Sequence, residues 1–222
     1  MDEAWASAPR FKSMDGVSGM ADYGLAGDDL EQMYQEFILE ASRDPHGKTR
    51  FAEDVSLESP ANGEVSGESS VAQAHEACVV AQSHQFNPTC GDEVTVRVNL
   101  TDGTDGKEHR IESVVWDGHG CSISQASLSV MTDMVQGKSI DDFTTMSETF
   151  HELMNSRGKG IDDSEKDELL GDAMVFEGVS KYPMRIKCAL LGWAAVKDSI
   201  AQALTKMPAA PAETVSTAEK NA

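Results

Sequence analysis

The sequence predicts an α+β fold, in which a small antiparallel β-sheet packs against helices. Val94, Val96, Val98 and Leu100 alternate with polar residues, which is typical of a strand with one buried face. A turn-rich connection (101–106) follows, and His109 to Trp116 is predicted to be the returning strand of a hairpin. Helical periodicity precedes this region and dominates the chain after it. We therefore expect two strands between one helix and a run of helices.

The predicted helices have recognisable starts and stops. The first begins near Asp28 and ends at Asp44–Gly47, with apolar residues at the spacing of one helix face: Leu30, Met33, Tyr34, Phe37 and Ile38. A second spans 123–136 before Gly137, with a predicted buried face of Ile123, Ala126, Val130 and Met134. Further helices are expected at 140–155 with Ser139 as its cap, at 162–172, and from Pro183 to about Thr205.

Composition divides the chain into one domain with two tails. Residues 1–27 and 206–222 are predicted to be disordered, and 28–205 to form the domain. Within it, residues 52–75 are rich in Ser, Glu, Gly and Ala and are predicted to be a flexible insert.

Charge and hydropathy exclude several classes of function. A net charge of −20 argues against direct nucleic-acid binding, which requires a basic surface. The sequence contains no apolar run of the roughly 20 residues that a membrane span needs. It also lacks a phosphate-binding loop and a Gly-x-Ser-x-Gly nucleophile motif. The acidic start Met1-Asp2-Glu3 is unlike a signal peptide, so we expect a cytoplasmic protein, in which four cysteines indicate metal or redox chemistry before disulfides.

Cys90 and Asp92 form the first candidate metal-binding pair. If the strand begins at Asp92, this carboxylate lies on the same face as Val94, where burial is costly unless it is paired or coordinates a metal. If the strand begins at Glu93, Asp92 remains in a solvated turn and can cap a backbone group. The pattern alone leaves both interpretations open.

Two further cysteines lie near predicted helix starts. Cys121 follows the bend Asp117–Gly120, and Cys188 lies off the predicted apolar stripe of the last helix, which consists of Ile186, Ala189, Trp193, Val196, Ile200 and Leu204. Helix N-termini favour thiolates, although an ordinary core cysteine also explains Cys121. Three thiolates and one carboxylate suit a borderline-soft metal such as zinc. Cys78 belongs to no cluster and is interpreted as a buried apolar residue or an incidental thiol, and His119 as a solvated bend residue or a spare ligand.

Taken together, these motifs resemble the SufU-type branch of the iron–sulfur assembly proteins related to IscU and NifU N-terminal scaffolds. The likeness rests on Asn87-Pro88-Thr89-Cys90-Gly91-Asp92, on Gly118 to Ser124 around Cys121, and on Lys181 to Cys188. It covers roughly residues 28–205. The long stretch between Cys121 and Cys188, and Lys187 where IscU-type scaffolds have histidine, favour the SufU type.

The resemblance implies a SufU/IscU-like fold and a specific chemistry. It implies zinc bound by Cys90, Asp92, Cys121 and Cys188, and a pyridoxal phosphate-dependent, SufS-type cysteine desulfurase as partner, with downstream iron–sulfur assembly proteins. A partner histidine would replace Cys90 on the zinc, and Cys90 would then accept the persulfide sulfur. From its charge and position, Arg185 is expected to dock the partner or orient a thiolate.

The leading hypothesis is thus a zinc-dependent sulfurtransferase that stimulates a cysteine desulfurase. Two alternatives stay open: a scaffold that assembles an iron–sulfur cluster on the same ligands, and an interaction module in which zinc is purely structural.

Overall fold

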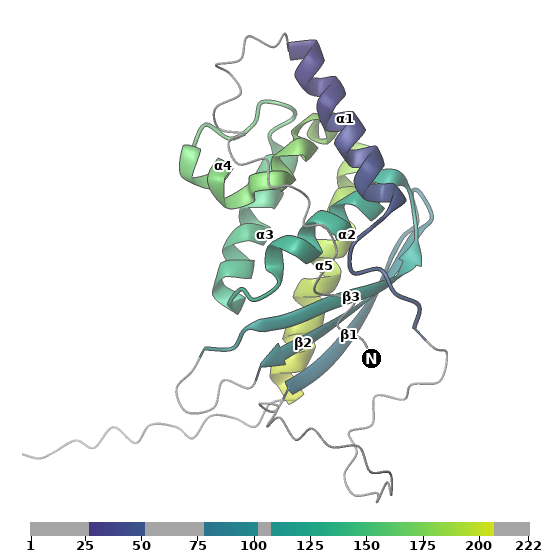
Figure 1. Ribbon diagram of the computed structural model, residues 1–222, viewed down its shortest axis with the longest axis vertical. Helices are drawn as coiled ribbons and strands as arrows, with labels where there is room; N and C mark the ends of the chain where they lie inside the picture. The colour runs from purple at the N-terminus through teal and green to yellow at the C-terminus, as the bar shows by residue number, and fades with distance from the viewer. Residues whose placement is uncertain (1–26, 52–77, 102–107, 207–222) are drawn as a thin grey trace, which may run out of the picture.

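The computed structural model describes residues 27–51, 78–101 and 108–206 (Figure 1). Its elements follow in this order: α1 (Gly27–Arg43), β1 (Cys78–Asn87), β2 (Asp92–Thr101), β3 (Ile111–His119), α2 (Ser122–Val135), α3 (Ile140–Asn155), α4 (Ser164–Leu170), the 3₁₀ segment η3 (Gly171–Lys181) and α5 (Pro183–Lys206). One antiparallel sheet of order β1-β2-β3 packs against the helices, with α5 along β1 and β2. The predicted α+β fold class is confirmed.

Parts of the predicted domain organisation lie outside the described residues. This holds for the insert at 52–75 and for both predicted tails, apart from Gly27 and Lys206, where α1 begins and α5 ends. None of the helices in the described ranges has the length and apolar character needed to cross a membrane.

The predicted hairpin is present as β2 and β3. Val94, Val96, Val98 and Leu100 are at most 1% exposed, and the intervening residues of β2 are only partly buried. This alternation places the hydrophobic core on the helix-covered face of the sheet. The strand begins at Asp92, so Asp92 faces the core together with Val94.

Two strands were expected, and the structure contains a third, β1. Its core-facing residues Ala81, Ser83 and Asn87 are small or polar, so the segment lacks the apolar alternation that indicates a strand. Ser83 is nevertheless buried because its hydroxyl donates a 2.6 Å hydrogen bond to Asp198 of α5. Cys78 is the first residue of β1, and its side chain is not among those described.

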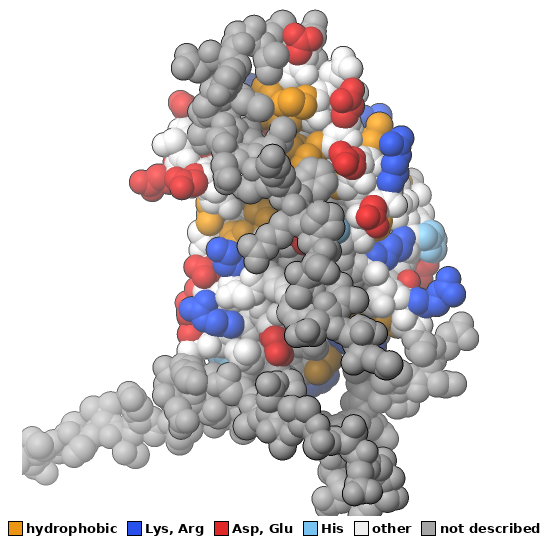
Figure 2. Space-filling model, viewed as in Figure 1, with side chains coloured by type: hydrophobic (Ala, Val, Ile, Leu, Met, Phe, Trp, Pro, Cys, Tyr) orange, Lys and Arg blue, Asp and Glu red, His pale blue; other side chains and the backbone are white. Residues whose placement is uncertain are grey.

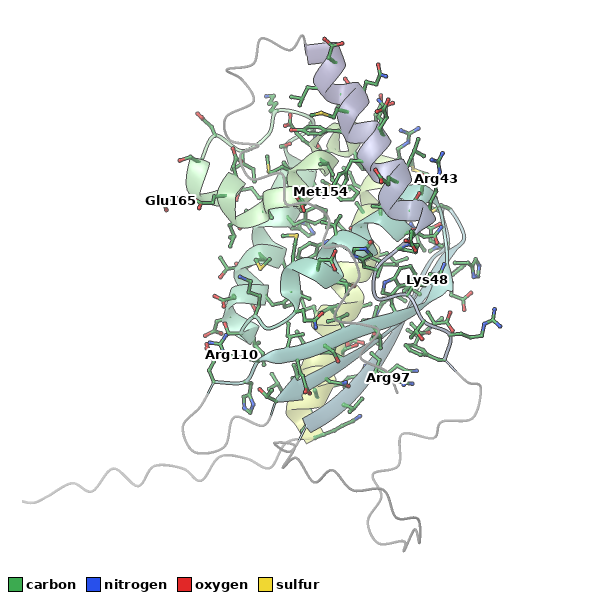
Figure 3. The ribbon with its side chains drawn as sticks, in the orientation of Figure 1. Arg43, Lys48, Arg97, Arg110, Met154 and Glu165 are labelled. Atoms are coloured by element: carbon green, nitrogen blue, oxygen red, sulfur yellow. The ribbon has the colours of Figure 1, made fainter. Side chains whose placement is uncertain are left out.

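The segment after α1 is attached to β3, an attachment that the pattern did not predict. Trp116 accepts a backbone hydrogen bond from Thr49 (2.8 Å) and donates one to Gly47 (2.9 Å). The Lys48 ammonium lies 5.1 Å from the centre of the Trp116 ring, a cation–π contact; Figure 3 labels Lys48 at this edge. These contacts hold the segment that follows α1 against the sheet.

Helix α2 is more deeply buried than expected. Of the predicted face, Ala126 and Val130 are buried, whereas Ile123 and Met134 are only partly so. Residues outside that face are buried as well: Ser124, Ser127, Leu128, Ser129, Met131, Thr132 and Val135. Small hydroxyl residues fit here because they bond to backbone groups: the Ser127 hydroxyl donates to the Ala189 carbonyl at 2.6 Å, and the Ser129 hydroxyl accepts the His46 N–H at 2.9 Å. Gly192 of α5 allows close approach, since a Cβ there would lie 2.5 Å from Leu128.

The remaining helices largely follow the prediction. Helix α3 matches at both ends, whereas the expected helix at 162–172 is shorter and continues into η3, which was not predicted. Tertiary packing explains η3: the Phe176 ring meets Phe150 edge-on at 5.9 Å, and Phe150 stacks on Trp193 at 4.7 Å. The single predicted stripe on α5 was wrong in part, because Leu204 is 41% exposed.

The capping box of α3 supports a stability prediction. The Ser139 hydroxyl accepts the Asp142 N–H at 2.9 Å, and the Asp142 carboxylate accepts the Ser139 N–H at 3.3 Å. We expect Ser139→Ala to lower the free energy of unfolding by about 1 kcal/mol. Urea unfolding followed by far-UV circular dichroism measures this change.

Thr145→Ala, an exposed substitution on the same helix, is the control and should be nearly neutral. Hydrogen bonds to the side chain and backbone of Ser139 lower the pKa of Asp142 below its ordinary value of 3.8. The part of this contribution that depends on the Asp142 carboxylate is therefore complete above the ordinary pKa and lost as the pH falls through the lower, folded pKa, whereas the bond from the Asp142 N–H to the Ser139 hydroxyl does not titrate. Equal losses from the two alanine variants would contradict the assignment.

Candidate metal centre

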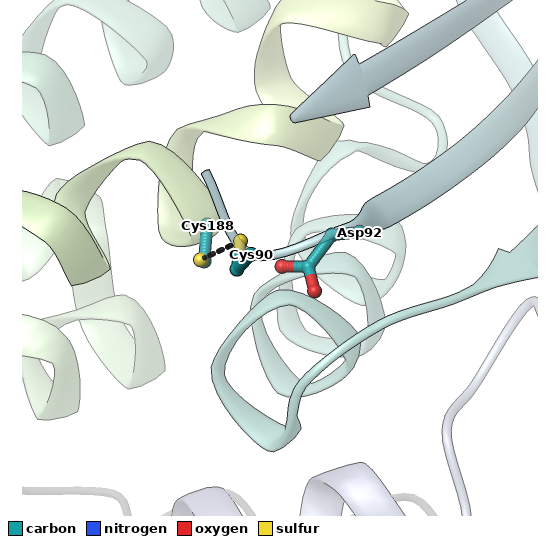
Figure 4. Close-up of side chains that lie close together, drawn as sticks. All are labelled: Cys90, Asp92 and Cys188. Atoms are coloured by element: carbon teal, nitrogen blue, oxygen red, sulfur yellow. Dashed lines mark hydrogen bonds between the residues drawn. The ribbon is translucent and has the colours of Figure 1, made fainter. Parts of the chain in front are cut away.

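Three segments far apart in the sequence meet at one end of the sheet. The turn between β1 and β2 presents Cys90, β2 begins with Asp92, and Cys188 lies in the second turn of α5. One ligand atom from each of these residues lies within 4.8 Å of the other two, and the sulfurs of Cys90 and Cys188 are 2.8 Å apart (Figure 4). The structure thus brings together three of the four side chains that the sequence singled out.

Asp92 is buried, which decides between the two interpretations of this residue. Its side chain is 2% exposed, so it is not in a solvated turn. The Cys121 backbone N–H donates to one carboxylate oxygen at 2.9 Å, and the Cys121 thiol lies 3.4 Å from the other. Burial raises the pKa of Asp92, but hydrogen bonds from the thiols of Cys90, Cys188 and Cys121 and from the Cys121 backbone outweigh it and place the pKa below its usual value. Asp92 is therefore ionised at neutral pH.

Cys121 is the N-cap residue of α2, where the bend becomes a helix as expected. Its sulfur reaches the cluster through Asp92 and is not within the 4.8 Å group. Gly120 makes this approach possible, because a Cβ on Gly120 would lie 3.0 Å from the carboxyl carbon of Asp92. Cys121 as a fourth ligand stays a prediction.

Cys188 differs from the expectation for a helix-start thiolate. It is 3% exposed, and burial, followed by hydrogen bonds to Cys90 and Asp92, raises its pKa well above the ordinary value. The helix start therefore does not by itself make Cys188 a thiolate. A cation among the four side chains would reverse this effect by stabilising the negative charge.

Asn87 belongs to the cluster, although sequence analysis gave it no role. Its side-chain N–H group lies 2.9 Å from the Cys90 sulfur and 3.6 Å from the Cys188 sulfur, and the residue is 4% exposed. The available signal was its place at the start of the Asn87–Asp92 motif, where a polar residue ends a strand. That signal could not be used because β1 itself was not predicted.

A groove of about 660 Å³ opens onto the cluster. Helix α1 forms one wall, and η3 with the start of α5 forms the other; Cys90, Cys121 and Cys188 are among the residues that line it. Cys90 is exposed there, whereas Cys188 is buried. The groove also has three exposed apolar side chains, Leu39, Tyr182 and Met184.

Arg185 and His119 occupy different surroundings. Arg185 lines the groove, and its guanidinium lies 4.7 Å from the centre of the Tyr182 ring. His119 pairs with Glu93 across the sheet. Directly paired residues share a face, so His119 points away from the face of Asp92, and it is exposed. The interpretation of His119 as a solvated bend residue is favoured over that of a spare ligand.

The donor set fits a metal ion by its chemistry. Thiol sulfurs and one carboxylate are the ligand types that zinc accepts, and Asp92 is a buried charge that such an ion would neutralise. A tetrahedral site of this composition requires Cys121 to join the three clustered residues.

Comparison with known proteins identifies the family. A model of the NifU-like N-terminal domain matches residues 54–189. The chain belongs to this family. The NifU-like match includes Cys90, Asp92, Cys121 and Cys188, so the whole candidate metal centre lies inside it. The resemblance inferred from the motifs is confirmed.

Two relatives carry names that describe different functions, sulfur transfer and cluster scaffolding. A zinc-dependent sulfurtransferase SufU from Bacillus subtilis is 45% identical over 116 residues, which covers 52% of this chain and 71% of the relative. An iron–sulfur cluster assembly scaffold protein IscU from Streptococcus pyogenes is 38% identical over 114 residues, which covers 51% of this chain and 65% of the relative.

Two solved structures share the fold of this chain. The N-terminal part of a nitrogen-fixing NifU-like protein from Brucella abortus aligns with a TM-score of 0.55 at 22% identity. The alignment covers 80% of this chain and 99% of the other. A second structure, of a hypothetical protein, aligns with a TM-score of 0.54 at 28% identity, and the alignment covers 77% of this chain and 98% of the other.

Gly118 allows a specific test of how the sheet positions the cluster. It has φ +147°, and a Cβ there would overlap the Glu93 carbonyl oxygen next to Asp92. We expect Gly118→Ala to separate the ends of β2 and β3, lower the thermal midpoint by several degrees and weaken metal retention. Differential scanning calorimetry and metal analysis measure both effects.

Gly137→Ala is the matched control, because Gly137 also has a positive φ (+77°) but faces open space. The Gly137→Ala variant should lose some stability through backbone strain and retain metal like the wild type. Normal metal retention in the Gly118 variant would contradict the prediction.

Proposed function

We propose that this chain is a zinc-dependent sulfur acceptor that takes persulfide sulfur from a cysteine desulfurase and stimulates it, in the service of iron–sulfur cluster assembly. The observation that supports this most directly is the unequal exposure of two adjacent sulfurs. Cys90 is exposed on the groove, and Cys188 behind it is buried. A cluster that serves only to hold a structural ion has no need for an accessible ligand. The name of the Bacillus subtilis relative supports the same activity.

Four residues are proposed to hold zinc: Cys90, Asp92, Cys121 and Cys188. When bound, zinc keeps the thiols deprotonated and protected from oxidants. Asp92 is ionised and buried, and so provides a fixed charge at the base of the site. Cys188 and Cys121 lie at the starts of packed helices, α5 and α2, which makes them anchoring residues.

Cys90 is proposed to be the sulfur that reacts. As a thiolate it attacks the outer sulfur of the partner's persulfide, which forms a new S–S bond on Cys90. The partner's own S–S bond breaks, and its cysteine leaves as a thiolate. The hydrogen of the persulfide stays with the transferred sulfur, so the step needs no oxidant or reductant.

The groove is proposed to receive the segment of the desulfurase that carries the persulfide. Exposed Tyr182 and Met184 offer apolar contact area beside Cys90. Arg185 lies among them and is proposed to dock the partner or orient a thiolate. On the face drawn in Figure 2, acidic and basic side chains are mixed rather than gathered into a basic patch, in line with a protein partner rather than nucleic acid.

Cluster scaffolding is the second candidate, because the Streptococcus pyogenes relative is named as a scaffold. The same ligands could hold iron and sulfide. Metal analysis of protein purified without oxygen separates the two functions: zinc without visible absorbance supports transfer, and labile iron with sulfide supports scaffolding.

The ligand set predicts a graded loss of zinc. We expect one zinc per chain in the wild type and substantially less in Cys90→Ala, Cys121→Ala and Cys188→Ala, because each removes a thiolate ligand. Asp92→Ala should also weaken retention. Inductively coupled plasma mass spectrometry of the purified proteins measures the stoichiometry. Cys78→Ala is the thiol control, and full zinc in Cys121→Ala would disprove the four-ligand site.

Sulfur transfer predicts stimulation of the desulfurase. The wild type should raise cysteine turnover by a SufS-type desulfurase, and a persulfide should form on Cys90, because an acceptor thiolate clears sulfur from the partner. Each of the three cysteine variants should abolish both effects, whereas Asp92→Ala retains part. Alanine production and mass spectrometry of Cys90 measure them. A wild type that neither stimulates nor carries a persulfide would contradict the proposal.

A further inference from the structure

The Asn87 side chain has an orientation fixed by its surroundings. Its carbonyl oxygen accepts the backbone N–H of Thr89 at 3.1 Å. The NH₂ group must therefore point the other way, toward the sulfurs of Cys90 at 2.9 Å and Cys188 at 3.6 Å. At 4% exposure, water does not compete for these donors. The carboxamide is thus a preset pair of N–H donors aimed at the reactive end of the cluster.

The sheet register places this donor group relative to Asp92. Asn87 and Asp92 are directly paired across β1 and β2, so both side chains lie on the same face. The turn between them is closed by a 2.9 Å hydrogen bond from the Gly91 backbone N–H to the backbone carbonyl of Asn87. Cys90 extends from this turn, which places its sulfur within reach of Asn87. Position and orientation of the donor are both set by the backbone.

We propose that Asn87 is a positioning residue for sulfur acceptance, an inference that rests on the proposed function. Its N–H group donates a hydrogen bond to the Cys90 sulfur when that sulfur carries a negative charge, and keeps the sulfur directed into the groove. A hydrogen bond to a charged sulfur is stronger than one to a neutral thiol. The shorter of the two distances belongs to Cys90, so the stabilisation favours the exposed sulfur over the buried one.

A purely structural role for Asn87 makes a different prediction. If Asn87 only closes the turn through Thr89, an aspartate can replace it, because a carboxylate also accepts the Thr89 N–H. If Asn87 serves the sulfurs, aspartate fails, since it has no donor and adds a like charge beside Cys90. Asn87→Asp and Asn87→Ala therefore separate the two roles. Thr89→Ala is the matched control for the partner-free alkylation of Cys90, because it changes an exposed side chain in the same turn and keeps the backbone N–H.

The experiment uses the zinc-loaded full chain in all four forms. Desulfurase turnover as a function of acceptor concentration gives kcat and KM, and alkylation of Cys90 by iodoacetamide, quantified by mass spectrometry, gives its reactivity without any partner. Losing a hydrogen bond to a charged group predicts about a 10- to 100-fold fall in kcat for both Asn87 variants, with KM unchanged. The Cys90 alkylation rate should change in both variants and stay at the wild-type value in Thr89→Ala.

Two results would overturn the inference. One is wild-type kcat and alkylation in Asn87→Asp with a loss in Asn87→Ala, which is the pattern of a turn residue. The other is values within about twofold of wild type in both variants, well below the effect expected for a charged hydrogen bond. For a variant that folds poorly, the sulfur-to-metal charge-transfer band of its cobalt-loaded folded fraction is measured instead. A shift to longer wavelength supports loss of the N–H donor, and an unchanged band contradicts it.

The two proposals fail in distinguishable ways. If the wild type does not stimulate the desulfurase but Cys90 alkylation still depends on Asn87 as described, the sulfur-transfer function is wrong and the positioning role stands. If the wild type stimulates and both Asn87 variants match it in turnover and alkylation, the function stands and the positioning role is wrong.

Discussion

The burial of the Asp92 carboxylate is the constraint on which the rest of the site depends. A charge that is 2% exposed at the end of an apolar strand face is costly unless every side of it is satisfied. Here a backbone N–H and surrounding thiols provide the partners, and a glycine at position 120 leaves the space for them. Satisfying this one carboxylate brings the β3–α2 bend and the first turns of α5 to the same point.

The opposing pKa shifts of Asp92 and Cys188 follow from that arrangement. Hydrogen bonds hold the Asp92 pKa low, and the same crowding and burial push the Cys188 pKa up. The site therefore holds one fixed negative charge together with a buried thiol that resists ionisation. A cation would stabilise the existing carboxylate and also make the thiolate favourable, so the proposed metal would be held by charge as well as by the geometry of its ligands.

Features of the fold and the site could be predicted where a residue's partners are close in the sequence, and were missed where the partners are distant. Ser139 could be placed because capping is local, whereas the period-two pattern of β2 put Asp92 on the core face only if the strand began there, which its burial in the structure decides. Strand β1 could not be predicted, since Ser83 and Asn87 are buried through bonds to distant α5 and to the cysteines. The depth of α2 and the 3₁₀ conformation of η3 were missed for the same reason. The difference in exposure between Cys90 and Cys188 depends on a groove whose walls, α1 and α5, come from opposite ends of the described chain.

The register of the sheet therefore matters for chemistry as well as for stability. Asn87, opposite Asp92, and Gly118, next to Val94, lie on the two neighbours of β2, so a single strand aligns the donor group, the carboxylate and the bend that leads to Cys121. A slip of one residue in either pairing would turn an entire set of side chains to the other face and take Asn87 or Cys121 away from the sulfurs. The core residues of β2 resist such a slip, because it would expose Val94, Val96 and Val98. The apolar alternation that identified the fold is thus the same feature that keeps Asn87 and Asp92 aligned with the Cys90 sulfur.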